Sequence, residues 1–384
     1  MSTGWATKRL GDVCAFDKAQ GIHRHLPYVG LEHIESHTAR FIGSTELQSA
    51  KSSTFRFSTE HVLYGRLRPY LNKVLAPDFE GHCSTEIFPI MPGAQLSREY
   101  LVYWFLADAT VDRINATCTG ARMPRADMND VLEFDFPFAP LPEQQRIVGL
   151  LDEAFAGLAT AKANAEKNLQ NARALFESHL HSVFTQRGNG WTDTKLDEVC
   201  GFQNGFAFKS SSFKPSGCPI LRISNIQDGK VDTDRLVFFE PTDYRENLDR
   251  YRIVADDLLI AMSGATTGKL GFNTESTVFH LNQRVGKFEP SKKLNKRFLY
   301  HFLSTKVEEN LRISAGAAQP NLSTEQIKGF VLPLPPIEEQ VRIVAVLESF
   351  ATETQRLASL YQQKLAALEA LKKSLLHQAF TGQL

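Results

Sequence analysis

At 384 residues the chain is too long for one small hydrophobic core, so two or more domains are expected. Basic and acidic residues balance at 43 each, which does not support a strongly electrostatic nucleic-acid binder unless basic groups cluster or partner chains contact the phosphates. No apolar run approaches the roughly 18 residues of a membrane span, and the N-terminus lacks an apolar signal segment. The five cysteines are widely spaced, without a CxxC pair. We therefore expect a cytoplasmic protein with reduced thiols, no membrane partner and no structural zinc site.

The first predicted domain, residues 1–139, contains short apolar segments separated by turn residues. Their β-branched and aromatic content favours strands. The predicted strands lie at 28–31, 40–43, 55–57, 61–64, 73–75 and 86–91. One helix is predicted from about Ser97 to Asn115, with Ser97 as its N-cap. The domain is therefore predicted to be mixed α/β and rich in strands.

The segment from Phe136 to Pro142 has alternating prolines, which should neither pair in a sheet nor continue a helix. We expect a short extended strut there. A long helix should follow, because Pro142 suits a first helical turn and Glu143 suits the positive end of the helix dipole.

The start of this helix occurs twice. Pro140–Val148 and Pro336–Val344 match at six of nine positions, and Leu175–Thr185 matches Leu371–Thr381. Both pairs are separated by 196 residues, so the two helices have equal lengths. The predicted organisation is a domain at 1–139, a spacer helix at 140–186, a domain at 187–335 and a second spacer helix at 336–384.

Small and large apolar residues recur on the two helices at steps of three and four, which is typical of a coiled-coil seam. One helix is rich in alanine and the other in leucine, which favours close mutual packing over two separate amphipathic helices. The predicted seam positions are Leu158, Ala161, Ala165, Ala172 and Leu175, with Tyr361, Leu365, Leu368, Leu371 and Leu375.

The second domain begins like the first. Five of its residues have an identical residue 186 positions earlier in the first domain: Trp191, Leu196, Val199, Cys200 and Phe202. Further along, Gly316 and Pro320 have an identical residue 196 positions earlier. The second copy has therefore gained a net ten residues in between, and Asn204–Phe213 is a candidate for part of that gain.

Motifs for an autonomous enzyme are absent. Gly264–Lys269 resembles a phosphate loop, but it has three residues between its glycines instead of four, and Leu270 follows the lysine. The sequence has no GxGxxG, HExxH or GxSxG motif and no methyl-donor signature. An enzyme with its own active site is therefore not predicted.

The duplicated Pro-x-x-Glu-Gln-x-x-Ile-Val helices, each preceded by a globular domain, resemble the specificity subunit of type I restriction–modification systems. Further similar segments are Leu259–Lys269, Leu281–Arg284, Gly316–Ser323 and His377–Leu384. The resemblance implies an α/β (α+β) fold with two strand-rich target recognition domains. Two long antiparallel helices forming a coiled coil would separate them, in a tandem-repeat, pseudo-twofold arrangement.

The same resemblance implies function and partners. Each domain would recognise one half of a bipartite, asymmetric site on double-stranded DNA. Two methyltransferase subunits would dock on the helices and carry S-adenosylmethionine, and restriction subunits would carry ATP and Mg²⁺. The chain itself would have no catalytic residues, cofactor or metal. A helix of about 40 residues would be roughly 60 Å long, enough to set half-sites one DNA turn of about 34 Å or slightly more apart.

Side-chain chemistry suggests which residues contact DNA. Arginine recognises guanine with two hydrogen bonds, lysine more often contacts phosphate, and amides pair with base edges. In the first domain the candidates are Arg66, Arg68, Tyr70, Lys73, Arg122 and Arg125. In the second they are Lys209, Ser263, Thr266, Thr267, Lys269, Asn282, Gln283, Arg284, Gln319 and Asn321.

Two other classes stay open from the sequence. A coiled-coil adaptor that joins protein partners without DNA recognition agrees with the neutral charge. A fused methyltransferase is disfavoured by the absence of cofactor motifs.

Overall fold

The computed structural model describes residues 4–23, 25–47, 52–120, 122–227, 229–314 and 321–384. The chain divides into two compact units. The first unit comprises Met1–Asn168 and Leu360–Leu384, and the second comprises Leu169–Ser359. Each long helix, α4 (Leu141–Thr185) or α8 (Ile337–Thr381), contributes one part to each unit.

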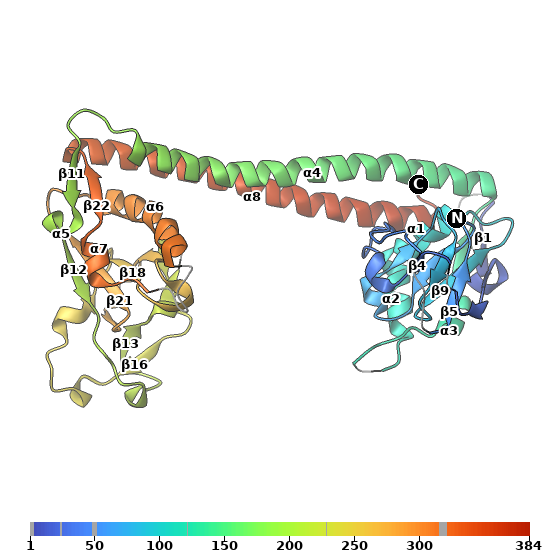
Figure 1. The fold of residues 1–384 in the computed structure, drawn as a ribbon, viewed down its shortest axis with the longest axis horizontal. Helices are drawn as coiled ribbons and strands as arrows, with labels where there is room; N and C mark the ends of the chain where they lie inside the picture. The colour runs from blue at the N-terminus through green and yellow to red at the C-terminus, as the bar shows by residue number, and fades with distance from the viewer. Residues whose placement is uncertain (1–3, 24, 48–51, 121, 228, 315–320) are drawn as a thin grey trace. The chain divides into compact units, whose positions relative to one another are not determined.

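The first unit contains a two-stranded sheet, β1-β10, and two four-stranded sheets, β2-β9-β6-β7 and β3-β5-β8-β4 (Figure 1). Their strands are β1 (Ala6–Arg9), β2 (Cys14–Phe16), β3 (Gln20–Gly21), β4 (Tyr28–Val29), β5 (Thr54–Phe57), β6 (Val62–Gly65), β7 (Val74–Leu75), β8 (Gly81–Cys83), β9 (Ile87–Pro92) and β10 (Asp135–Phe138). The predicted strand at 40–43 is only an isolated bridge between Ile34 and Phe41. Strands β1, β2, β3 and β8 were not predicted.

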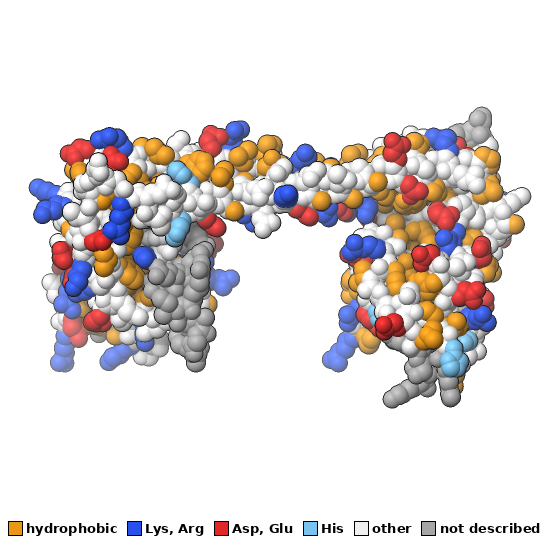
Figure 2. Space-filling model, turned by 45° about the horizontal axis from the view of Figure 1, so that its top comes forward, with side chains coloured by type: hydrophobic (Ala, Val, Ile, Leu, Met, Phe, Trp, Pro, Cys, Tyr) orange, Lys and Arg blue, Asp and Glu red, His pale blue; other side chains and the backbone are white. Residues whose placement is uncertain are grey.

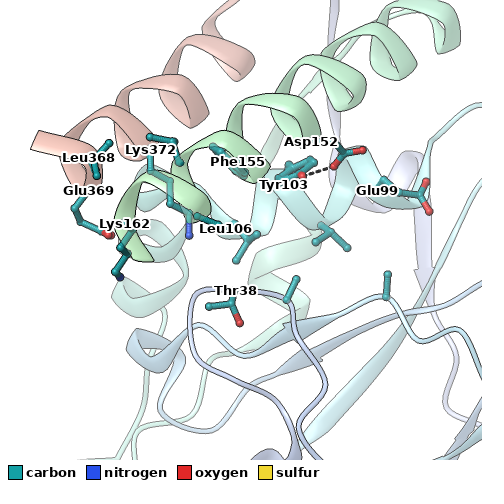
Figure 3. A pocket seen from close by; sticks show the side chains of 15 residues that line it. Thr38, Glu99, Tyr103, Leu106, Asp152, Phe155, Lys162, Leu368, Glu369 and Lys372 are labelled. Carbon is teal, nitrogen blue, oxygen red and sulfur yellow. Dashed lines mark hydrogen bonds between the residues drawn. The ribbon is translucent and has the colours of Figure 1, made fainter. Parts of the chain in front are cut away.

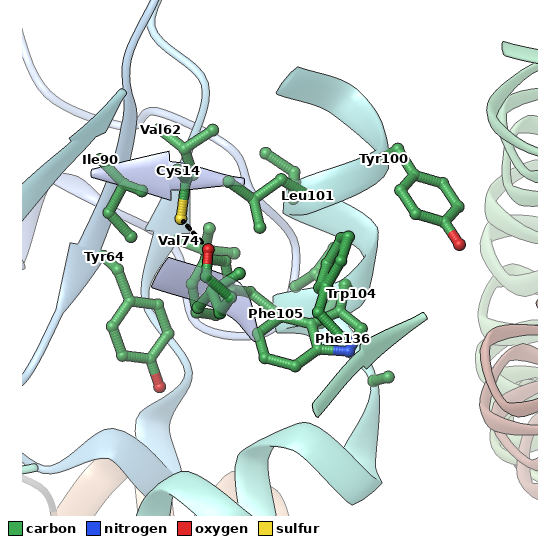
Figure 4. Close-up of a cluster of buried hydrophobic side chains, with 14 of the residues drawn as sticks. Cys14, Val62, Tyr64, Val74, Ile90, Tyr100, Leu101, Trp104, Phe105 and Phe136 are labelled. Atoms are coloured by element: carbon green, nitrogen blue, oxygen red, sulfur yellow. Dashed lines mark hydrogen bonds between the residues drawn. The ribbon is translucent and has the colours of Figure 1, made fainter. Parts of the chain in front are cut away.

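The main core of the first unit lies between the β2-β9-β6-β7 sheet and helix α1 (Arg98–Leu106) (Figure 4). Strand residues such as Val62 and Ile90 face Leu101 and Phe105 of the helix, and all four are fully buried. Tyr100 lies on the other side of α1, where its ring meets Phe380 of α8 at 5.1 Å between centroids. Helix α1 therefore joins the sheet to the long helices.

The helix predicted between Ser97 and Asn115 is two helices. Ser97 is the N-cap of α1, as predicted, and its hydroxyl accepts a hydrogen bond from the Tyr100 amide at 3.3 Å. Ala107 then adopts an extended conformation with ψ of 130°, and α2 (Asp108–Ala116) begins after it. The expectation of one continuous helix was wrong. The break was not foreseen because good helix-forming residues continue through it. A short helix α3 (Met128–Leu132) follows.

The prolines of the 136–142 segment also behave differently from the prediction. Strand β10 pairs antiparallel with β1, with Thr7 opposite Pro137. Because this sheet has only two strands, both are edge strands, and an edge strand tolerates a proline that has no N–H to donate. The second unit repeats this pair with Asp193 opposite Pro333.

The second unit contains the pair β11-β22, the six-stranded sheet β12-β21-β18-β19-β15-β14 and the four-stranded sheet β16-β13-β20-β17. In Figure 1, β13 and β16 lie at the end of this unit away from β11 and β22. The strands are β11 (Thr192–Lys195), β12 (Cys200–Asn204), β13 (Cys218–Leu221), β14 (Ile226–Gln227), β15 (Gly229–Val231), β16 (Val237–Phe239), β17 (Arg252–Ile253), β18 (Leu258–Ala261), β19 (Leu270–Phe272), β20 (Phe279–Leu281), β21 (Val285–Pro290) and β22 (Val331–Leu334). The shorter helices are α5 (Leu196–Val199), α6 (Lys296–Ser314) and α7 (Thr324–Lys328).

Part of the extra length of the second unit falls where the sequence suggested. The parallel pair Tyr28–His82 in the first unit has Ile220–His280 as its counterpart. The separation between the copies thus grows from 186 residues at Phe16 and Phe202 to 192 at Tyr28 and Ile220. A gain of six residues therefore lies between β12 and β13, where Asn204–Phe213 is located.

The two long helices run in opposite directions within each unit. In the first unit, Ile147 and Leu151 near the start of α4 share a buried cluster with Leu376 and Ala379 near the end of α8. In the second unit, Leu180 and Phe184 near the end of α4 share one with Val344 and Leu347 near the start of α8. The mixed α/β class with two strand-rich domains and long antiparallel helices is therefore confirmed.

The seam prediction is only partly right. Ala165 and Ala172 are buried, and Leu158, Ala161, Tyr361, Leu365, Leu368 and Leu375 are partly buried. Leu175 and Leu371, however, are 50% and 47% exposed, so their assignment to the seam was wrong. Their chain neighbours Phe176 and Lys372 are the partly buried residues there, which shifts the contact face by one position.

A buried glutamine fixes the first turn of each long helix. Gln144 is fully buried, and its carbonyl oxygen accepts the Ser97 amide at 2.8 Å. Its side-chain amide donates to the carbonyl oxygens of Gln95 at 3.0 Å and Ala139 at 2.8 Å. Gln340 makes the same three bonds in the second unit, to Asn295, Lys293 and Pro335, at 2.8 to 2.9 Å.

We expect Gln144→Ala to destabilise the first unit by about 3 kcal/mol, since three buried backbone groups lose their partner. The measurement is the free energy of unfolding of the full chain by denaturant titration. Gln145→Ala is the matched control, because Gln145 is exposed one residue later, and it should change stability by less than about 0.5 kcal/mol. Equal effects of the two variants would contradict the anchoring role.

Candidate nucleic-acid interface

Two loops of the first unit are joined by main-chain hydrogen bonds. One loop follows β6 and carries Arg66 and Arg68, and the other precedes α3 and carries Arg125. Leu67 and Arg125 form a β-bridge. The Arg68 amide donates to the Pro124 oxygen at 2.8 Å, and the Ala126 amide donates to the Arg66 oxygen at 2.9 Å. The two arginine clusters predicted from the sequence are thus brought together.

Glu86 lies at the centre of this arrangement. Its carboxylate accepts the Arg66 Nε at 3.1 Å and the Arg125 Nε at 2.9 and 3.1 Å. A further contact joins Arg125 Nη2 to the same carboxylate at 2.9 Å. Partial burial alone raises the pKa of the Glu86 carboxyl, but the hydrogen bonds from Arg125 and Arg66 outweigh it, so the pKa lies below its ordinary value. Glu86 is therefore ionised at neutral pH and orients both guanidinium groups.

Three other predicted residues of the first unit are exposed around these loops. Arg68, Tyr70 and Arg122 all have largely solvent-accessible side chains. Arg68 and Asn72 have φ of 52° and 40°, in the left-handed region that costs energy for residues with a side chain. They flank the short turn Pro69–Leu71, so the loop holds a tight shape that presents Arg68 and Tyr70 to solvent.

Lys73 does not fit its predicted phosphate contact. Its ammonium group donates to the carbonyl oxygens of Leu31 and Ile34, both at 2.7 Å. These bonds tie β7 to the segment around Leu31. The structure therefore gives Lys73 a structural role.

The second unit repeats the same backbone frame 196 residues later. Ser263 and Asn321 form a β-bridge, as Leu67 and Arg125 do in the first unit. The Leu322 amide donates to the Met262 oxygen at 2.9 Å, which corresponds to the bond from Ala126 to Arg66. The backbone is the same while the side chains differ.

The side chains on this second frame include several predicted residues. Arg284 and Gln283 are exposed and Asn282 is partly buried. Arg284 Nη1 lies 3.5 Å from the Asn321 Oδ1. Gly205 packs against the Asn282 backbone so closely that any Cβ would meet the Asn282 oxygen at 2.0 Å. The prediction for Gln319 lies outside the described residues.

The two threonines of the loop at 263–269 use their hydroxyl groups internally. Thr267 is buried and donates to the Gly264 oxygen at 2.7 Å, and Thr266 donates to the Ile223 oxygen at 3.0 Å. Lys269 Nζ lies 3.3 Å from the Gln227 Oε1. The hydroxyl groups of Thr266 and Thr267 therefore shape the loop, and their phosphate contacts stay a prediction.

Lys209 lies apart from this frame, in the segment between β12 and β13. Its side chain is exposed, and its amide donates to the Tyr244 hydroxyl at 3.2 Å. It can contact only a ligand that also covers this segment.

Glu86 was missed in the sequence analysis, because an acid is not expected in a site for an anionic ligand. Phe88, which carries the Arg66 guanidinium over its ring at 5.4 Å, was also missed. Aligning the second copy could have found the position of Glu86. The main-chain amide of Arg66 donates to the main-chain oxygen of Glu86, and that of Met262 donates to the main-chain oxygen of Arg284, both at 2.9 Å. These two bonds show that Glu86 and Arg284 are equivalent positions.

The visible surface carries no single-sign field. In Figure 2, lysine and arginine side chains are interspersed with aspartate and glutamate over the face of each unit that is drawn. Among the described residues, no cluster of three or more His, Cys, Asp or Glu side chains could hold a metal ion. The five cysteines are free. Within the part of the chain that the structure describes, no helix is both long and apolar enough to cross a bilayer.

A separate cavity of about 430 Å³ lies in the first unit between α1, α4 and α8 (Figure 3). Phe155, Leu106 and Leu368 form apolar parts of its wall, and Tyr103 donates a hydrogen bond to Asp152 at its edge. None of the residues predicted to contact DNA lines this cavity.

The duplicated frame now has a counterpart among known proteins. Residues 2–169 and 188–369 match the family described as the type I restriction modification DNA specificity domain. The chain belongs to this family, and it contains the domain twice.

Curated relatives agree with the family. The MjaVIII specificity subunit of Methanocaldococcus jannaschii is 27% identical over 284 residues, which cover 69% of this chain and 65% of that protein. The EcoBI and EcoDI specificity subunits of Escherichia coli are 27% and 29% identical, over 56% and 52% of this chain and 43% and 46% of their own lengths. The aligned part thus spans less than two thirds of each of these relatives. They are named for specificity, and not for a catalytic step.

Solved structures support the fold. A chain from a structure of a type I R-M system has a TM-score of 0.85 at 23% identity, covering 100% of this chain and 99% of that one. The HsdS subunit from Thermoanaerobacter tengcongensis has a TM-score of 0.70 at 22% identity, covering 100% and 98%. The family predicted from the duplicated helices is confirmed by the family match over residues 2–169 and 188–369.

We expect Lys73→Met to lower the free energy of unfolding by about 2 kcal/mol, because two carbonyl groups lose a charged donor. Lys18→Met, at an exposed lysine of the same unit, is the control and should change it by less than about 0.5 kcal/mol. Thermal or denaturant unfolding of the full chain checks both. A destabilisation no larger than that of the control would restore Lys73 as a candidate for DNA contact.

Proposed function

We propose that this chain is the non-catalytic specificity subunit of a type I restriction–modification complex. Each unit recognises one half of a bipartite, asymmetric site on double-stranded DNA. The long helices set the distance between the halves and dock two methyltransferase subunits.

The observation that carries this proposal is the repeated frame with different side chains. Leu67–Arg125 and Ser263–Asn321 are the same backbone bridge at equivalent positions of the two copies. The first presents arginines around an acid, and the second presents asparagine, glutamine and one arginine. A frame that is kept while its exposed side chains change is what two domains with different base preferences require.

We propose that the catalytic steps belong to partner chains in the cytoplasm. Methyltransferase subunits would supply S-adenosylmethionine, and restriction subunits would supply ATP hydrolysis with Mg²⁺. Family membership and the relatives' names support methyltransferase and restriction subunits as the kinds of partner. The proposal adds that two methyltransferase subunits bind.

The faces of the long helices opposite the buried glutamines suit partner docking. Leu150 on α4 and Val346 on α8, which are 42% and 57% exposed, occupy equivalent positions 196 residues apart. Arg146 and Arg342 lie one turn earlier on the two helices and are also exposed. Two similar surfaces on one chain would accept two copies of one partner.

The equal lengths of α4 and α8 support their role as spacers. Each contains 45 residues and is therefore about 67 Å long. Because both helices would have to change together to alter the spacing, we propose that the number of unspecified base pairs is fixed by helix length.

We expect the complex with its methyltransferase to modify adenines in one bipartite motif. Replacing residues 187–335 by the matching domain of a relative should change one half of that motif and leave the other unchanged. Sequencing that detects methylated bases in host DNA measures both. A swapped complex that still modifies the original motif would overturn the domain assignment, and no sequence preference at all would favour an adaptor role.

Removing residues 161–167 together with 357–363 shortens each helix by about 10 Å. This corresponds to about three base pairs of B-DNA. We expect the gap between the two half-sites to shorten while both halves keep their sequence, as read from the methylated motif. The control is an Ala substitution at exposed Gln145, which keeps helix length and should keep the gap. An unchanged gap in an active deletion variant would reject the spacer role.

A further inference from the structure

One position carries opposite charges in the two units. The Arg66 amide bonds to the Glu86 oxygen, and the Met262 amide bonds to the Arg284 oxygen, each at 2.9 Å. Glu86 and Arg284 therefore occupy the same place on the repeated frame. The side chain at this position is therefore negatively charged in the first unit and positively charged in the second.

In the first unit, Glu86 holds the inner edges of two guanidinium groups. Its side chain is 22% exposed, against 34% for Arg66 and 38% for Arg125, so the carboxylate is more buried than the two guanidinium groups. Glu86 holds Arg125 through Nε and Nη2, and Arg125 Nη1 donates to the Met123 oxygen at 3.4 Å. Glu86 holds Arg66 through Nε alone.

The outer nitrogens of Arg66 remain available. Among the described residues, Nη1 and Nη2 of Arg66 make no hydrogen bond, and the Phe88 ring supports the guanidinium plane at 5.4 Å. Arg66 and Arg125 line a cavity of about 330 Å³, and Lys18, Thr119 and Asn129 form other parts of its wall. A supported guanidinium with two free donors matches the O6 and N7 acceptors of guanine in the major groove.

The second unit lacks every part of this arrangement. Met262 takes the place of Arg66, Asn321 that of Arg125 and Gly286 that of Phe88. The space above Gly286 is filled by Phe202, whose ring would lie 2.1 Å from a Cβ at that position. Arg284 and Asn321 offer a mixture of donors and an acceptor instead of donors alone.

We propose that Glu86 is a positioning residue that fixes Arg66 and Arg125 for the recognition of guanine in one half-site, and that Arg284 at the equivalent position gives the other half-site a different base preference. This inference rests on the proposed function, because it assigns a base to the same interface. It places a negative charge inside a DNA-recognition site for a physical reason. The acid restricts two flexible side chains before DNA binds and so reduces the entropy lost on binding.

The test is Glu86→Gln in the full complex with its methyltransferase, since the amide keeps the shape but donates as well as accepts. We expect the preference for guanine at one position of one half-site to fall by about tenfold or more, as a lost bidentate contact would imply. The other half-site should not change. Glu80→Gln is the matched control, because Glu80 pairs with Arg56 in an exposed ion pair of the same unit.

Arg125→Lys is the second variant, which keeps the charge but loses the two-pronged contact with Glu86. It should relax the same position as Glu86→Gln, and the double variant should be no worse than the stronger single one. Uniformly weaker methylation of all sites, or an unchanged motif in a stable variant, would overturn the role of Glu86. A wild-type complex without a bipartite motif would instead overturn the proposed function, so the two failures are distinguishable.

Discussion

The buried amide of Gln144, and its equivalent in Gln340, is the interaction on which each half of the structure depends. A glutamine can accept one hydrogen bond and donate two, and here all three go to backbone groups of segments that the long helix must join. The start of the helix, the exit of the last strand and the loop before α1 are fixed at one point. The second unit uses the same three bonds before α6. The glutamine of the repeated motif thus joins each domain to its long helix.

Much of the domain organisation could be predicted because it follows from the spacing of the repeated sequence blocks. Equal separations of the repeated blocks require helices of equal length, and the Ser97 cap follows from local chemistry. The break at Ala107 could not be predicted, since it depends on packing against the sheet. The exposure of Leu175 and Leu371 reflects a shift of the contact face by one residue, which a seam of mixed alanine and leucine does not fix. Pro137 sits in a strand because tertiary context provides an edge.

The candidate interface was predictable by residue type and not by role. Arg66 and Arg125 were predicted as candidates because basic residues cluster in turn-like segments. Glu86 was not predicted, because it lies in the turn before β9, far from both arginine segments in sequence, and has the wrong charge for a DNA ligand. Lys73 has an internal role that its sequence did not indicate, because a lysine that caps carbonyl groups has the same sequence signature as one that binds phosphate. Which of the remaining candidates contacts a base depends on the path of the DNA, which side chains alone do not define.

The bridges between Leu67 and Arg125 and between Ser263 and Asn321 are made by main-chain atoms. Because every residue except proline supplies the same donor and acceptor, the frame does not depend on which side chains it carries. Replacement of a surface side chain therefore leaves the scaffold intact while it changes the chemical pattern offered to a ligand. A lineage that must keep altering what it recognises can do so here by single codon changes, without first finding a compensating change in the core.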